Sequence, residues 1–316
     1  MSLIDQAAKR LEELRRAGIA AGDPAVSLAN PGSARTAERT PLPEAAAVAA
    51  HTWGRSAVEA PAGPRTVQPP PPGRPTHQHV ELDLVALKAR GFITPDSPRA
   101  RIADDFRVIK RPIIGNAIAP LTRVHKGNLV MVTSAVSGEG KTFTSINLAM
   151  SLAMELDTTV LLIDGDVASP GFPGVLQTPS GPGLIELLTR DDIEPADALI
   201  RTNVPNLTIL PAGAHHERAT ELLASAQMAK LLDQLSSRYP DRIMVFDSPP
   251  LLATTEARVL ASHMGQVVMV VAADNTRRHA VSLALSTIEG CDVVLTVLNK
   301  AVQSEVGTYG YDYRAA

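Results

Sequence analysis

The sequence has a single cysteine, Cys291, few aromatic residues and no long apolar run, and each shortage excludes a class of protein. One thiol cannot form a disulfide framework, an iron–sulfur site or a zinc site of clustered thiolates, so we expect a reducing compartment. No stretch of about eighteen mostly apolar residues exists, which predicts that the chain does not cross a membrane. The first residues, MSLIDQAAKRLEELRRAG, are charged where a signal peptide would be apolar.

The charge of the chain is nearly balanced. Lys and Arg number 30 against 33 Asp and Glu, which gives a net charge of −3 over 316 residues. A protein that neutralises many phosphates needs a surplus of positive charge, so we expect no nucleic-acid partner. Apolar residues make up 45% of the chain, which is enough for a buried core.

Proline is concentrated near the start of the chain, and tyrosine is concentrated at its end. Eleven of the 25 prolines lie in the first 75 residues, and three of the four tyrosines lie in the last eight. We predict an amphipathic helix within residues 1–20, because Leu3, Ile4, Ala7, Leu11 and Leu14 follow helical spacing. The Pro/Ala-rich residues 21–79 cannot bury enough apolar surface to offset the entropy of ordering them, and they are predicted to be a disordered linker.

Apolar runs that suit strands alternate with amphipathic helices from Leu129 onward. Runs such as VLLID and IMVFD are apolar at both odd and even positions, as in a parallel sheet covered on both faces. We therefore predict an α/β, doubly wound, mainly parallel sheet with its ligand at the carboxyl ends of the strands. The predicted strands are Leu129–Thr133, Thr159–Asp164, Leu207–Leu210, Arg242–Asp247, Gln266–Val271 and Val293–Leu298. The predicted helices are Leu82–Arg90, Ala103–Lys110, Thr142–Glu155, Gly183–Thr189, Thr220–Arg238, Thr255–Ser262 and His279–Glu289.

The first of these strands runs into AVSGEGKT, residues 135–142, which matches the phosphate-loop pattern A/G-x4-G-K-T between a strand and a helix. Gly138 and Gly140 permit backbone angles that turn successive N–H groups toward a β-phosphate. Lys141 supplies a positive charge for the β and γ oxygens, and the Thr142 hydroxyl can ligate Mg²⁺. The predicted nucleotide-binding residues of this loop are Ser137, Gly138, Glu139, Gly140, Lys141, Thr142 and Phe143.

Two further strands of the predicted sheet end in aspartate. Asp164 and Asp166 follow one strand, and Asp247 ends another. Carboxylates at this edge of the sheet lie beside the metal that a phosphate loop holds. We predict that Thr142, Asp164 and Asp247 hold Mg²⁺. Asp164 is the first choice for the general base of phosphoryl transfer and Asp166 is the second, with Lys141 as the other catalytic residue.

The last predicted strand leads into Asn299 and Lys300, the start of the guanine motif N-K-x-D. Val302 stands where that motif has its aspartate, so the carboxylate that pairs with guanine is missing. Adenine is therefore favoured, with Asn299 beside it, and the predicted cofactors are ATP and Mg²⁺.

Together these motifs resemble those of the bacterial tyrosine autokinases, which regulate the synthesis of capsular polysaccharide and exopolysaccharide. Residues 162–166 are similar to the additional Walker A′ motif of that family, residues 245–247 to its Walker B motif, and residues 220–225 to a motif that opens a helix. The resemblance implies a protein-tyrosine kinase with a P-loop NTPase fold. The C-terminal cluster resembles the tyrosines that these kinases phosphorylate on one another, here Tyr309, Tyr311 and Tyr313.

Residues ahead of the phosphate loop carry a second part of the resemblance. Asp104, Arg107 and Lys110 resemble the oligomerisation motif E-x2-R-x2-R, with Asp and Lys substituted. The family then implies a ring-like homo-oligomer, a membrane-anchored polysaccharide co-polymerase as activator, and a cytoplasmic kinase recruited to the inner face of the plasma membrane. Residues 106–112 and the N-terminal helix look most like the subgroup associated with exosortase loci.

The same resemblance assigns the remaining parts of the chain. Residues 80–125 are predicted to be a helical segment for oligomerisation and activator docking, 126–303 an ATP-binding kinase domain, and 304–316 a flexible tail. The alternative is an ATPase switch similar to ParA and MinD, without tyrosine kinase activity. That group has a signature lysine early in the phosphate loop, where this chain has Val136.

Overall fold

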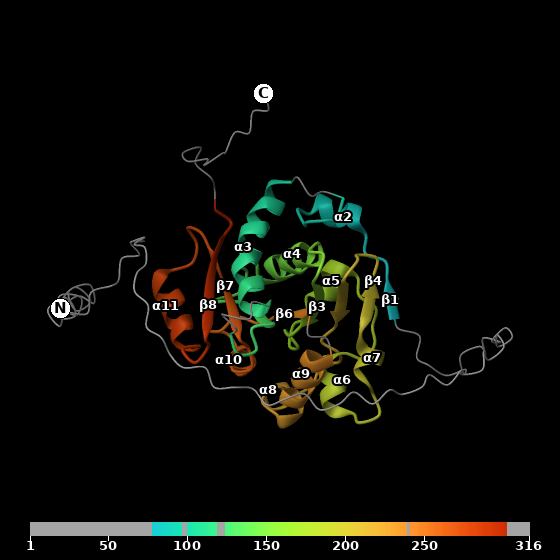
Figure 1. Cartoon of the computed structure of the whole chain (residues 1–316). Coiled ribbons are helices and arrows are strands. Elements are labelled where there is room, and N and C mark those ends of the chain that lie inside the picture. Colours follow the sequence, from blue (N-terminus) through green and yellow to red (C-terminus); the bar gives the residue numbers. More distant parts are fainter. Residues whose placement is uncertain (1–77, 97–99, 119–123, 239–240, 302–316) are drawn as a thin grey trace, which may run out of the picture. The chain divides into compact units, whose positions relative to one another are not determined.

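The computed structural model describes residues 78–96, 100–118, 124–238 and 241–301 (Figure 1). The predicted N-terminal helix, nearly all of the predicted linker and the tyrosine-rich tail lie outside the described residues.

One eight-stranded sheet organises the described residues. Its strand order is β1-β4-β5-β3-β6-β2-β7-β8, and every pair of neighbours is parallel except β4 and β5. The prediction of a doubly wound, mainly parallel sheet is confirmed. The strands are β1 Gln78–Val80, β2 Leu129–Ser134, β3 Thr159–Asp164, β4 Ile200–Thr202, β5 Leu207–Leu210, β6 Arg242–Asp247, β7 Gln266–Ala272 and β8 Val293–Asn299.

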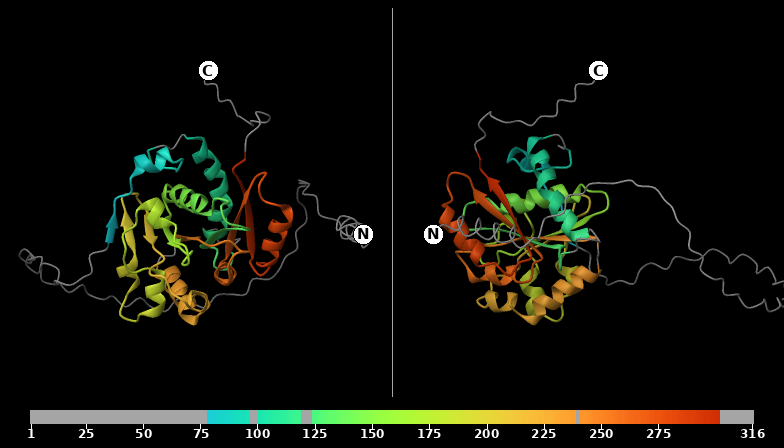
Figure 2. Two further views of the ribbon diagram at one scale, coloured as in Figure 1. Left: turned by 180° about the vertical axis from the view of Figure 1, so that it is seen from behind. Right: turned by 60° about the vertical axis from the view of Figure 1, so that its left-hand side comes forward.

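Helices cover both faces of this sheet (Figures 1 and 2). Helices α2 to α5 contribute side chains to one apolar cluster, and α6 to α11 contribute to the other. The helices are α2 Leu84–Ala89, α3 Arg101–Ile118, α4 Lys141–Ala153, α5 Phe172–Leu176, α6 Leu184–Thr189, α7 Pro195–Ala198, α8 Ala219–Leu223, α9 Ala226–Arg238, α10 Thr255–Ala261 and α11 Arg278–Ser286.

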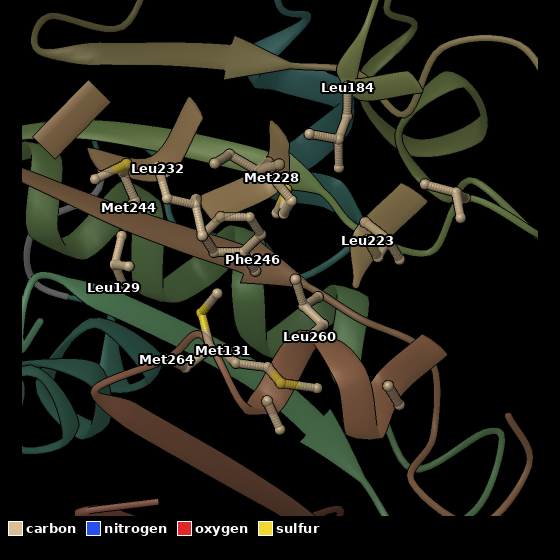
Figure 3. Close-up of a cluster of buried hydrophobic side chains, with 14 of the residues drawn as sticks. Leu129, Met131, Leu184, Leu223, Met228, Leu232, Met244, Phe246, Leu260 and Met264 are labelled. Carbon is tan, nitrogen blue, oxygen red and sulfur yellow. The ribbon is translucent and has the colours of Figure 1, made fainter. Parts of the chain in front are cut away.

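The central strands β2, β3 and β6 are buried at almost every position, because both faces of the sheet are covered by helices. In β2, Leu129 and Met131 pack into the cluster under α6 to α11, whereas Val130 and Val132 pack against α3 and α4. Figure 3 shows the cluster under α6 to α11, with Phe246 of β6 among methionine and leucine side chains. This double burial fixes the carboxyl ends of β2, β3 and β6, where the predicted site residues lie.

Helix α3 is longer than the sequence indicates, because it continues through Pro112. Proline lacks an N–H, so the carbonyl of Val108 loses its helical partner, but Val108 lies on the exposed side, where water can bind that carbonyl. Tertiary contacts hold the additional turns. Ile113 is fully buried, and the Asn116 amide donates to Gln266 Oε1 at 2.9 Å.

Two further local predictions were wrong. Residues 220–238 form two helices, because the Ser225 hydroxyl accepts from the Met228 N–H at 3.3 Å and caps the start of α9. Residues 78 and 79, predicted as linker, pair with β4 as the edge strand β1. Neither β1 nor β4 was predicted, because three residues carry too little periodicity to indicate a strand. Within the described ranges, no helix combines the length and apolarity that membrane spanning requires.

Candidate active site

The phosphate loop connects β2 to α4 and has the backbone that the sequence predicts. Gly138 has φ 81° and Gly140 has φ 102°, both in the left-handed region that favours glycine. Gly140 caps α4 without a side-chain hydrogen bond, which leaves the first N–H groups of that helix for an anion. A Cβ on Gly140 would lie only 2.1 Å from Asn299 Nδ2, so glycine is also required for space.

The Glu139 side chain turns into the protein rather than toward the mouth of the loop. It is buried, and its carboxylate accepts hydrogen bonds from Val136 N at 2.7 Å, from Ala272 N at 3.2 Å and from the Thr276 hydroxyl. Glu139 was predicted to bind nucleotide, but only its backbone is placed to do so. Its carboxylate instead ties the loop to the end of β7. Thr276 was not predicted, because nothing in the sequence relates it to a residue 137 positions earlier.

The Asn-Lys pair after β8 holds the same loop from the other side. Asn299 Nδ2 donates to the Glu139 carbonyl at 2.8 Å, and Lys300 Nζ donates to the Gly138 carbonyl at 2.6 Å. The prediction gave Asn299 a place beside the base and gave Lys300 no role. The structure brings both to the phosphate loop, where they bind two of its backbone carbonyls.

Asp164 and Asp247 lie at the carboxyl ends of neighbouring strands and face each other in register. Both are almost completely buried. Asp164 Oδ2 accepts a hydrogen bond from Phe172 N at 3.1 Å, whereas Oδ1 of Asp164 and Oδ1 of Asp247 have no hydrogen-bond partner among the described residues. Buried carboxylate oxygens without donors are the ligands that a hard cation such as Mg²⁺ prefers.

Burial makes ionisation of these two carboxyls costly. It raises the pKa of Asp164 to about 7, and the nearby charges of Asp247 and Asp166 raise it further. Burial also raises the pKa of Asp247 to about 6, although the Thr142 hydroxyl and the Lys141 ammonium partly offset it. A divalent cation would favour the ionised form of both.

Thr142, Lys141 and Asp166 complete the predicted set. A Cβ on Gly171 would meet the Thr142 hydroxyl at 3.2 Å and Asp247 Oδ2 at 3.6 Å, so these two groups lie together. Burial raises the pKa of Asp166 as well, and the Lys141 charge counteracts it. Asp166 is less buried than Asp164, and its Oδ1 accepts from Ser169 N at 3.1 Å.

The residues brought together fit a magnesium–nucleotide site. In the described ranges, no three His, Cys, Asp or Glu side chains gather as they would to hold a metal unaided. Mg²⁺ is usually held by one or two carboxylates together with substrate phosphates and water, so two aspartates and a threonine beside the phosphate loop suffice.

Helices α8 and α10 approach this site from the other face of the sheet. The Thr220 hydroxyl donates to Glu256 Oε1 at 2.7 Å, and the Glu256 charge raises the pKa of Asp166. The motif at residues 220–225 could be predicted from the sequence, but Glu256 could not, because only the packing of α8 on α10 relates it to the site.

The three residues of the predicted oligomerisation motif do not share one environment. Asp104 and Arg107 form an ion pair one helical turn apart on α3, and Asp104 is exposed. Lys110 is buried, and its ammonium contacts the Ser151 carbonyl at 2.6 Å and Glu155 Oε1 at 2.7 Å. Lys110 therefore joins α3 to α4 within the chain, and its role in oligomerisation stays a prediction.

Comparison with known proteins shows which family the chain resembles. A family model described as an AAA domain matches residues 127–302. The chain is 30% identical over 233 residues to the tyrosine-protein kinase CapB of Staphylococcus aureus, covering 72% of this chain and 98% of CapB. Tyrosine-protein kinase YwqD of Bacillus subtilis is 29% identical over 225 residues, covering 70% of this chain and 91% of YwqD.

The fold is also similar to solved kinase structures. The crystal structure of the chimeric protein CapA2B2 matches with a TM-score of 0.57 and 27% identity, covering 68% of this chain and 92% of the chimera. The residues that the family model matches include the phosphate loop and the strands β3 and β6, which end at Asp164 and Asp247.

Proposed function

Because the chain belongs to the bacterial tyrosine-protein kinases, we propose that it transfers the γ-phosphoryl group of ATP to tyrosines of its own C-terminal cluster. The acceptors are Tyr309, Tyr311 and Tyr313 of a second copy. The observation that carries this proposal is a pair of buried carboxylate oxygens beside the phosphate loop, one on Asp164 and one on Asp247, which accept no hydrogen bond from any residue in the described ranges.

Different groups of the phosphate loop bind the phosphates and stabilise the charge of the transferred group. The N–H groups at the start of α4 bind the β-phosphate, and Lys141 stabilises the charge that develops on the transferred group. Thr142, Asp164 and Asp247 hold Mg²⁺, which neutralises phosphate charge when bound. A phenol with an ordinary pKa near 10 is a poor nucleophile at neutral pH, so the reaction also needs a base.

Asp166 is the better placed base. It is partly accessible, whereas Asp164 is completely buried and accepts a backbone hydrogen bond. In the proposed step, the Asp166 carboxylate takes the phenolic proton. The phenol oxygen then bonds to the γ-phosphorus, and ADP leaves with the electrons of the broken P–O bond.

The wider role is part of the same proposal. We infer that the protein acts as a homo-oligomer in the cytoplasm, regulates exopolysaccharide synthesis, and is recruited to the membrane by a membrane-anchored co-polymerase partner. The similarity to a chimera named CapA2B2 supports a two-component arrangement, because its name joins a CapA part to a CapB part. The narrower resemblance to exosortase-associated kinases stays a prediction.

Purified protein incubated with γ-labelled ATP and Mg²⁺ tests the proposal. Wild type is compared with Lys141→Met, with a Tyr309→Phe/Tyr311→Phe/Tyr313→Phe variant, and with the control Lys230→Met, which changes an exposed lysine of α9. Label on tyrosine is expected in wild type and in Lys230→Met. It is expected to fall at least a hundredfold in the other two.

The outcomes separate the alternatives. Hydrolysis of ATP without labelled tyrosine in wild type, with an activator fragment present, would support the ParA-like switch and refute the kinase. Label that persists in the triple phenylalanine variant would show that the acceptor lies elsewhere in the chain.

A further inference from the structure

A basic cluster lies at the start of α11, directly after the turn that follows β7. Arg277 and Arg278 are both exposed, His279 follows them, and the nearest acidic residue in the sequence is Asp274. Neither guanidinium forms a hydrogen bond or an ion pair with another residue in the described ranges. Two adjacent positive charges without a partner repel each other and attract an anion.

The backbone of α11 adds to this positive potential. Arg277 is the N-cap of the helix, and its side chain makes no capping hydrogen bond. The first N–H groups of a helix have no acceptor within that helix, and together they carry a partial positive charge. A phosphate at this point would therefore meet helix N–H donors as well as the two guanidinium groups.

The end of β8, after which the tyrosine-rich tail begins, lies close to this cluster, and Figures 1 and 2 show α11 next to β8. Asn299 is paired with Ala272 across the two strands, and its carbonyl accepts a hydrogen bond from Ala273 N at 2.8 Å. The chain then turns, because Thr276 N donates to the Ala272 carbonyl at 3.1 Å. Arg277 is the next residue, so one short turn separates the cluster from the end of β8.

Residues 302–316 have the charge and the length to reach this cluster. Glu305 and Asp312 outnumber Arg314, so the segment is acidic before any modification. Each phosphate on a tyrosine adds roughly −1.5 to −2 charge at pH 7. The first acceptor, Tyr309, is eight residues beyond the last described residue, which is an extended span of about 26–29 Å.

We propose that the start of α11 binds the phosphorylated tail of the same chain, with Arg277 and Arg278 contacting a phosphotyrosine. The inference rests on the proposed function, which supplies the phosphate. A guanidinium binds phosphate through paired N–H donors, and a short tether gives the tail an effective concentration in the millimolar range. A tail held on its own chain is withdrawn from the active site of a second copy. One phosphate therefore limits the modification of the two tyrosines that remain.

Fluorescence anisotropy with a labelled synthetic peptide tests this site. The peptide has the sequence of residues 302–316 with phosphate on all three tyrosines, and its unphosphorylated form is the control ligand. The protein is the full chain of the triple phenylalanine variant, whose own tail cannot be phosphorylated. Arg277→Gln/Arg278→Gln and the single Arg278→Gln alter the cluster. Arg201→Gln/Lys230→Gln is the matched control, because it removes two exposed charges from β4 and α9.

The phosphopeptide is expected to bind the control variant as tightly as it binds the triple phenylalanine variant. Its affinity is expected to fall at least tenfold in the double arginine variant, the cost of one lost charged hydrogen bond, and less in Arg278→Gln. The unphosphorylated peptide should bind more weakly than the phosphopeptide. Phosphopeptide affinity that is equal in the arginine variants and the control would overturn the proposal. The single variant decides the question where the double substitution lowers stability.

A membrane surface is the competing anionic partner, so the same variants are sedimented with vesicles of phosphatidylserine and phosphatidylcholine. If the arginine substitutions weaken vesicle binding but leave phosphopeptide binding unchanged, the cluster is a membrane contact and the tail proposal is overturned. Wild-type protein with a phosphorylated tail tests the intramolecular contact. It should bind the labelled phosphopeptide at least tenfold more weakly than the triple phenylalanine variant, because its own tail occupies the cluster. Equal binding would refute that contact.

The two proposals fail separately, because the peptide is synthetic and its binding needs no kinase activity. If the phosphopeptide requires the two arginines but the protein forms no phosphotyrosine, the kinase proposal fails and the binding site stands. If phosphotyrosine forms while the arginine variants bind the phosphopeptide normally, the binding site fails and the kinase stands.

Discussion

Replacing the buried Asp164 carboxyl with an amide should stabilise the protein at alkaline pH when nucleotide and Mg²⁺ are absent. The pKa of Asp164 is raised from 3.8 to about 7 by burial and by its acidic neighbours. Below pH 4 the carboxyl is protonated in both the folded and the unfolded state. Between about pH 4 and pH 7 the unfolded chain releases the proton and the folded chain retains it, so the folded state loses stability as pH rises.

The size of the effect follows from this shift. Each pKa unit corresponds to about 1.36 kcal/mol, so the raised pKa lowers the free energy of unfolding of the wild type by about 4 kcal/mol at pH 8 and by about 2 kcal/mol at pH 5. Asparagine keeps the shape of the side chain and never ionises. We therefore expect Asp164→Asn to exceed the wild-type free energy of unfolding by about these amounts at the two pH values.

Urea unfolding followed by circular dichroism, in EDTA at pH 5, 6.5 and 8, measures the difference. Asp247 titrates in both proteins, so the difference between them reports the ionisation of Asp164 together with its coupling to Asp247. Asp157→Asn, which changes an exposed carboxylate after α4, is the control and should stay within about 0.5 kcal/mol of wild type. The reasoning is refuted if Asp164→Asn is no more stable than wild type at pH 8. Added Mg²⁺ and ADP should stabilise the wild type more than the variant, which lacks one of the three proposed metal ligands.

Three further substitutions test the loop and its supports. Gly140→Ala places a Cβ on a backbone with φ 102°, only 2.1 Å from Asn299 Nδ2, so the loop must change shape. Calorimetry should therefore show ADP affinity reduced about tenfold or more. Glu139→Ala leaves buried N–H groups without acceptors and should lower the free energy of unfolding by about 2–4 kcal/mol in urea. Lys110→Met, which breaks the contact with Glu155, should cost about 1–3 kcal/mol. It should leave the oligomer distribution unchanged in light scattering, and a shift to smaller species would show that Lys110 reaches a neighbour.

The strand ends and the phosphate loop could be predicted from the sequence, because each depends on a short pattern of residues. The strand ends at Asp164 and Asp247 and the loop glycines 138 and 140 are each specified within about ten consecutive residues. The errors arose where a distant contact outweighed a local preference. Pro112 predicts a helix end, but the burial of Ile113 carries α3 past it.

The roles of single side chains could not be predicted in the same way. Glu139 lies within the phosphate-loop motif, yet its carboxylate faces Thr276 because a buried acid needs donors that only β7 and the following turn supply. Lys110 has the spacing of a surface motif, and burial against α4 makes it an internal contact.

The sequence by itself determined that this chain has a phosphate loop, two carboxylates at strand ends and an alternation of strands and helices, because spacing along the chain encodes each of these. The tertiary structure alone decided that Asp164 and Asp247 face each other in register and that Asn299 returns to hold the loop. Strand order brings these residues together across 83 and 160 positions, and the packing of two sheet faces, rather than any local pattern, selects that order.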